Sequence, residues 1–88
     1  MERYSVLIGK NAKLDFLRIP FPFRRQVNQR VNKMKSDPRL AGAEAIAGSN
    51  RFRLDVAEWQ ILYEVDDAAR TISIVAFQKV DPPSPGGG

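Results

Sequence analysis

The chain of 88 residues is long enough for one small domain, because a typical domain holds about 100–200 residues. Hydrophobic residues make up 43% of the chain and charged residues 27%, which is typical of a folded globular protein and too apolar for a disordered one. The sequence contains neither cysteine nor histidine. This excludes disulfides, thiolate and imidazole metal sites, and catalysis by a histidine base.

Charge is unevenly distributed along the chain. The net charge is +4, from 14 basic and 10 acidic residues. Residues 10–39 contain nine basic and two acidic side chains, whereas residues 54–69 contain five acidic side chains and no basic one. A basic block favours a polyanion such as nucleic acid as the partner, and the solvated face of a Lys- and Arg-rich helix gives the same pattern.

The sequence carries no signal for a membrane or for secretion. The longest unbroken apolar run, residues 74–77, is far shorter than the about 20 residues that span a membrane. Residues 1–4 lack the charged-then-apolar pattern of a secretion signal. We therefore expect a soluble cytoplasmic protein with no membrane partner.

The first half of the chain predicts a strand and two helices. Residues 3–8 are rich in β-branched and aromatic types, which predicts a strand. Asn11 is the expected N-cap of a short helix through Arg18, with Leu14 and Leu17 on one face, and the prolines that follow end this helix. A second helix is predicted over residues 22–35 from a stripe of apolar residues. That stripe consists of Phe23, Val27, Val31 and Met34.

The second half predicts a loop and three strands. Residues 39–50 are expected to form a loop, in which residues 43–47 have weak helical character. Strands are expected at 51–56, 59–65 and 71–79, with a tight turn at 66–70. The order β-α-α-β-β-β predicts an α+β domain in which a helical hairpin packs on one face of an antiparallel three-stranded meander. We assign residues 1–80 to this domain and residues 81–88 to a flexible Pro- and Gly-rich tail.

No local enzyme motif is present, and we expect neither a metal nor a cofactor. Asp66 and Asp67 have the composition of a metal site, but in a tight turn Asp is favoured because it caps backbone groups. Arg51 and Arg53 share one face of their strand because side chains two apart point the same way. Together with Gln60 and Lys79 they could form a positive sheet face that holds a phosphate, or they could be the solvent face of an amphipathic strand.

Three segments resemble the RelE/ParE superfamily, the toxins of type II toxin–antitoxin pairs. Residues 34–39 (MKSDPR) resemble the helix exit L-x-x-D-P-R, and residues 52–67 (FRLDVAEWQILYEVDD) resemble Y-R-L-R-V-G-D-Y-R-I-I-Y-E-I-D-D. Residues 74–79 (IVAFQK) resemble L-A-V-G-H-R. The resemblance extends from residue 4 to residue 79 and implies the RelE/ParE-like fold.

The resemblance also implies a function. The ribonuclease branch of the family cleaves messenger RNA in the ribosome with Lys and Arg side chains and without metal. Arg53 and Lys79 match family positions that stabilise phosphate charge, and Arg51 would position the RNA backbone. Gln60 stands where the family has a second arginine, and Asp55 replaces another position that is often basic, so the implied site is weakened.

The resemblance further implies partners. A cognate antitoxin is expected to be an acidic segment that folds on contact, and the basic helical face is expected to contact ribosomal RNA. The residues of that face are Arg24, Arg25, Arg30, Lys33 and Lys35. Three alternatives stay open: an RNA interferase that inhibits translation, a gyrase inhibitor that acts by binding, and a catalytically degenerate homologue that binds antitoxin or nucleic acid. Such modules also serve in plasmid stabilisation.

Overall fold

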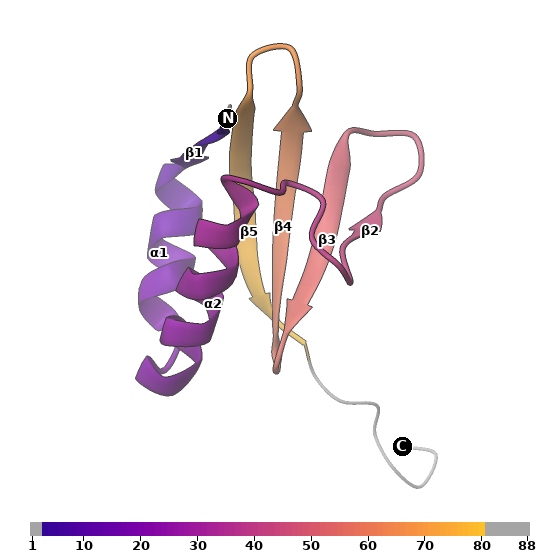
Figure 1. Ribbon diagram of the computed structural model, residues 1–88. Helices are drawn as coiled ribbons and strands as arrows, with labels where there is room; N and C mark the ends of the chain where they lie inside the picture. Colours follow the sequence, from indigo (N-terminus) through magenta and orange to yellow (C-terminus); the bar gives the residue numbers. More distant parts are fainter. Residues whose placement is uncertain (1–2, 81–88) are drawn as a thin grey trace, which may run out of the picture.

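The computed structural model describes residues 3–80, which form a sheet with two helices on one face (Figure 1). The predicted tail at 81–88 lies outside the described residues. The helices form a hairpin whose connection contains Pro20, which cannot continue a helix. The elements are β1 (Ser5–Ile8), α1 (Lys10–Arg18), α2 (Phe21–Met34), β2 (Glu44–Ala45), β3 (Arg51–Val56), β4 (Trp59–Asp66) and β5 (Thr71–Lys79).

The sheet has the strand order β1-β5-β4-β3-β2. The strands β3, β4 and β5 form the predicted antiparallel meander, while β1 lies parallel to β5. Along β4, buried residues alternate with more exposed ones, as expected for a strand with one face against a core. The predicted α+β architecture is therefore confirmed, with the helices on one face and an open face opposite.

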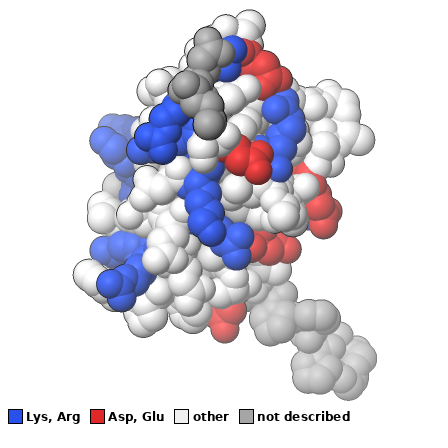
Figure 2. Space-filling model, in the orientation of Figure 1, with Lys and Arg blue, Asp and Glu red and all other residues white. Residues whose placement is uncertain are grey.

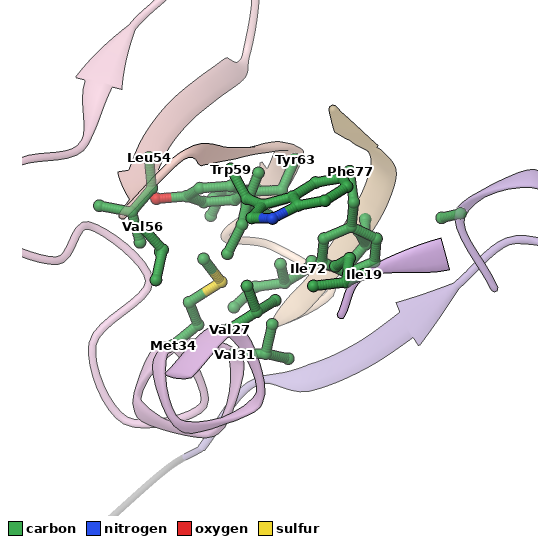
Figure 3. Close-up of a cluster of buried hydrophobic side chains, with 14 residues drawn as sticks. Ile19, Val27, Val31, Met34, Leu54, Val56, Trp59, Tyr63, Ile72 and Phe77 are labelled. Carbon is green, nitrogen blue, oxygen red and sulfur yellow. The ribbon is translucent and has the colours of Figure 1, made fainter. Parts of the chain in front are cut away.

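The core lies between α2 and the covered face of the sheet. Val27, Val31 and Met34 project from α2 toward the strands, as predicted from their spacing (Figure 3). Burying an aliphatic side chain of this kind contributes roughly 1.5–3 kcal/mol. Tyr63 is fully buried, and its hydroxyl donates a hydrogen bond of 2.8 Å to the carbonyl of Pro38. Burial raises the pKa of Tyr63 to about 12, so this hydroxyl stays a donor at neutral pH.

The start of α1 differs from the prediction. Gly9, rather than Asn11, occupies the N-cap position, and no side chain caps the helix. The stripe of α1 that faces the sheet contains Ala12, which is buried, and Phe16, which packs against the core. The face that carries Leu14 and Leu17 is exposed to solvent.

The weak helical character predicted for residues 43–47 was wrong. Glu44 and Ala45 instead form β2, in which Glu44 is paired with Arg53 and Ala45 with Phe52. The reason is tertiary: the outer edge of β3 has free backbone groups, and a two-residue strand satisfies part of them.

The turn between β4 and β5 confirms the capping role expected for aspartate. The Asp66 carboxylate accepts a hydrogen bond of 3.0 Å from the Ala69 N–H. Asp67 instead binds the Arg39 guanidinium through two hydrogen bonds of 3.1 and 2.7 Å and accepts another from the Tyr4 hydroxyl. Hydrogen bonding by Arg39 lowers the pKa of Asp67 from 3.8 to about 2. This cluster ties the chain after α2 to the far end of the sheet.

Candidate nucleic-acid interface

The open face of the sheet brings together three of the four predicted phosphate-contacting residues. Arg51, Arg53 and Asp55 alternate with the inward-facing residues of β3. Gln60 on β4 is paired with Asp55, so the two side chains lie on the same face. The Gln60 amide donates a hydrogen bond of 3.3 Å to the Asp55 carboxylate.

Both arginines of this face are already paired with carboxylates of the same chain. Arg51 donates from Nε to Glu64 at 2.8 Å, and Arg53 donates from Nη2 to Glu44 at 2.7 Å. Asp55, two residues beyond Arg53 on the same face, adds a third carboxylate, so the face carries more negative than positive charge around the predicted site. Sequence analysis did not identify Glu44, since only the pairing of β2 with β3 brings it opposite Arg53.

Lys79 does not join the arginines. It is paired with Trp59, a core residue, so it lies toward the helix-covered side at the exposed end of β5. The cause is a β-bulge: Leu62 is paired with Ala76 but Tyr63 with Ile74, which leaves one extra residue in β5. An extra residue exchanges the two faces of a strand. The expectation that Arg51, Arg53 and Lys79 meet at one spot is therefore wrong.

The basic side chains predicted on the second helix are presented to solvent. Arg25, Arg30 and Lys33 are exposed on α2, and none of them forms an ion pair within residues 3–80. Figure 2 shows Lys and Arg gathered on the side of the molecule that the two helices form. Lys35 is half-buried just after α2, and its carbonyl accepts the Tyr4 N–H at 2.7 Å.

Arg24 has a structural position that separates it from the other helical cations. Its guanidinium donates hydrogen bonds to the carbonyls of Leu17 at 2.8 Å and Ile19 at 3.3 Å, at the end of α1. It also lies over the rings of Phe16 and Phe21, at 5.6 and 5.4 Å from their centroids. A cation at a helix C-terminus and against aromatic rings stabilises both, so Arg24 holds the helical hairpin together.

A cleft lies beside Arg24, with a volume of about 660 Å³. Its lining is aromatic and basic and contains no acidic residue. Phe21, at the mouth of the cleft, is 79% exposed. This cleft was not predicted from the sequence, although an aromatic residue between two prolines was a usable signal. The lining residues are Phe16, Phe21, Pro22, Arg24, Arg25 and Asn28.

Two further observations concern residues 3–80 alone. No helix within them is both long and apolar enough to span a lipid bilayer. No group of three or more acidic side chains in this part of the chain is arranged to hold a metal ion.

Solved structures with the same architecture are toxins and toxin–antitoxin complexes. The isolated RelE toxin of Escherichia coli has a TM-score of 0.80 at 12% identity, and the match covers 90% of this chain and 86% of that chain. A chain of the RelBE2 toxin–antitoxin complex of Mycobacterium tuberculosis has a TM-score of 0.77 at 19% identity, covering 88% and 98%. An Escherichia coli RelE variant in complex with an antitoxin RelBc peptide has a TM-score of 0.74 at 14% identity, covering 90% and 85%.

These matches define the fold of the chain. No family model matches the sequence, and no curated protein does so either. The structural matches nevertheless cover nearly the whole of both chains, so the similarity extends to the complete arrangement of helices and strands. The chain has the RelE-like α+β fold, as the resemblance implied.

Proposed function

We propose that this protein is the toxin of a type II toxin–antitoxin pair and that it inhibits translation through contacts with messenger and ribosomal RNA. The observation that carries the proposal is the near-complete overlap with the isolated RelE toxin. The exposed cations of α2, which have no ion pair among the described residues 3–80, add to it, because phosphate contacts by Lys and Arg supply most of the sequence-independent affinity for nucleic acid.

In the first version of this proposal the protein cleaves messenger RNA slowly, without metal, on the ribosome. Arg53 would stabilise phosphate charge, Gln60 would donate a hydrogen bond, and Arg51 would position the backbone. Removing one preorganised charge-stabilising donor costs about 3–4 kcal/mol, or roughly a hundred- to a thousandfold in rate. Since Lys79 lies on the other side of the sheet, we propose that cleavage is weak and that Lys79 contributes to it least.

A second version is favoured by the ion pairs of the open face. Because Arg51 and Arg53 are both paired with carboxylates, the face suits a protein that acts by binding, either to gyrase or to RNA without cutting it. The two versions differ in their dependence on Arg53. Cleavage requires a phosphate contact at that position, whereas binding through the helices does not.

Inducible expression without antitoxin tests both versions. We expect growth arrest in either case, and harmless expression would contradict the toxin assignment. Mapping the 5′ ends of translated messages should reveal cuts within codons for the first version, and these cuts should disappear in Arg53→Gln. Arrest without cuts supports the second version, and induction of the DNA-damage response then identifies the gyrase route.

We further propose that the antitoxin docks an acidic, amphipathic segment at the cleft between α1 and α2. The cleft offers aromatic surface and two arginines with no carboxylate in its lining, which matches an apolar and acidic peptide. The product of a neighbouring small gene should bind the purified protein and reverse growth arrest. Phe21→Ser should weaken this binding, whereas Leu7→Ser, which removes an exposed side chain of β1, should not.

A further inference from the structure

The pairing of Arg53 with Glu44 differs from the pairing of Arg51 with Glu64. Glu64 belongs to β4, which has a neighbour on each side in the sheet. Glu44 belongs to β2, which has two residues, lies at the edge of the sheet and is paired with β3 alone. Glycines with positive φ lie on both sides of it, Gly42 at 93° and Gly48 at 78°.

We propose that Glu44 is an intramolecular competitor for the phosphate that would bind at Arg53. The proposal rests on the proposed function, because it takes RNA as the ligand of the open face. The Glu44 carboxylate, 2.7 Å from Arg53 Nη2, occupies the position that a phosphate oxygen would need. Glu44 thereby lowers the affinity of the open face and sets how readily RNA is engaged there.

The position of Glu44 makes this competition reversible. Its side chain is 67% exposed and Arg53 is 44% exposed, so solvent screens their attraction. An exposed ion pair of this kind is weak, so a phosphodiester, whose single negative charge is shared by two oxygens, can replace it. Glu64, by contrast, is 34% exposed on a central strand and keeps Arg51 neutralised. Arg53 is therefore the cation of this face that RNA can capture.

The effect of removing the competing charge can be bounded. A carboxylate about 5 Å from a phosphate in an aqueous environment opposes binding by about 1 kcal/mol, which corresponds to a two- to fivefold change in affinity. Engaging one more phosphate on a single strand steepens the salt dependence, with a change in the log–log slope of about 0.7. Glu44→Gln should therefore tighten RNA binding two- to fivefold and steepen its salt dependence.

Fluorescence anisotropy with a labelled oligouridine tests the proposal on the full chain. The control is Glu58→Gln, which makes the same charge change in the turn between β3 and β4, where the Glu58 side chain has no ion-pair or hydrogen-bond partner among residues 3–80. The double variant Arg53→Gln/Glu44→Gln also removes Arg53, the side chain proposed to bind the phosphate. We expect the gain in Glu44→Gln alone, no comparable gain in Glu58→Gln, and no gain when Arg53 is absent.

Three results would overturn the proposal: unchanged affinity in Glu44→Gln, an equal gain in Glu58→Gln, or a gain that persists without Arg53. The proposed RNA function fails separately. If neither the wild type nor Glu44→Gln binds oligouridine at low salt, both proposals are wrong. If the wild type binds through α2 and Glu44→Gln changes nothing, the role of Glu44 alone is wrong.

Discussion

The cations exposed on α2 and the arginines of the open sheet face differ in whether a carboxylate of the same chain pairs with them. On α2, Arg25, Arg30 and Lys33 face solvent and have no ion pair in the part of the chain that the structure describes. On β3, each arginine is held by a carboxylate of the same chain. The net charge of +4 therefore says little about where a polyanion would bind. Under the proposed function, we therefore expect the cations of α2 to supply most of the affinity for RNA and the cations of the open sheet face to supply less of it.

The largest expected effect comes from neutralising the helical surface. The variant Arg25→Gln/Arg30→Gln/Lys33→Gln should bind oligouridine roughly tenfold or more weakly at low salt, with a slope of log affinity against log salt reduced by about 2. Arg51→Gln/Arg53→Gln is the comparison for the sheet, and we expect a clearly smaller loss per cation removed, because carboxylates of the same chain already pair with both arginines. If the two variants lost equal affinity for oligouridine per cation removed, the proposed difference between α2 and the open sheet face would be wrong.

A smaller gain is expected from rebuilding a positive site on the open face. Gln60 and Gln78 are directly paired there, so Gln60→Arg/Gln78→Lys places two cations beside Asp55. We expect oligouridine affinity to rise roughly three- to tenfold, in proportion to the added phosphate contacts. If cleavage is detectable in the wild type, message cutting should increase as well.

The control for this gain adds the same charges farther along the sheet. Thr71 and Ser73 precede the bulge and are paired with Asp66 and Glu64. Thr71→Arg/Ser73→Lys should give a clearly smaller gain, because each new cation lies opposite a carboxylate, whereas the pair at positions 60 and 78 has only Asp55 opposite it. Equal gains would mean that total charge alone, rather than its position beside Arg53, controls binding.

Local sequence patterns predicted the fold, but they did not predict which side chains lie together at the candidate site. The stripe that includes Val27 and Val31 has helical spacing, and Phe52 and Leu54 have strand spacing, so the sequence alone predicted these elements and the core. Lys79 was misplaced because a bulge of one residue exchanges the two faces of β5, and no local pattern marks it. Glu44 was missed because its partner is fixed by strand pairing.

The contact that joins the end of α2 to the β4–β5 turn was equally invisible in the sequence. Tyr4 and Asp67 are 63 positions apart, and Arg39 reaches the same carboxylate from the chain after α2. No local sequence pattern marks a contact between segments so distant along the chain. The D-P-R segment at residues 37–39 thus indicated where α2 ends, and the structure adds that Arg39 links this end to the β4–β5 turn.

The smallest expected effect is a pH dependence of stability at this link. Because Arg39 lowers the pKa of Asp67 from 3.8 to about 2, the ionised carboxylate stabilises the folded state. That contribution is complete above about pH 4 and is lost as the pH falls from there to about 2. Asp67→Asn should therefore lower the melting temperature by a few degrees at pH 7, and the difference from wild type should vanish near pH 2. Asp66→Asn serves as the comparison, since its carboxylate caps a backbone N–H in the same turn without an arginine. A constant difference between Asp67→Asn and wild type from pH 7 to pH 2 would mean that the link between the end of α2 and the β4–β5 turn depends on shape and hydrogen bonding rather than on charge.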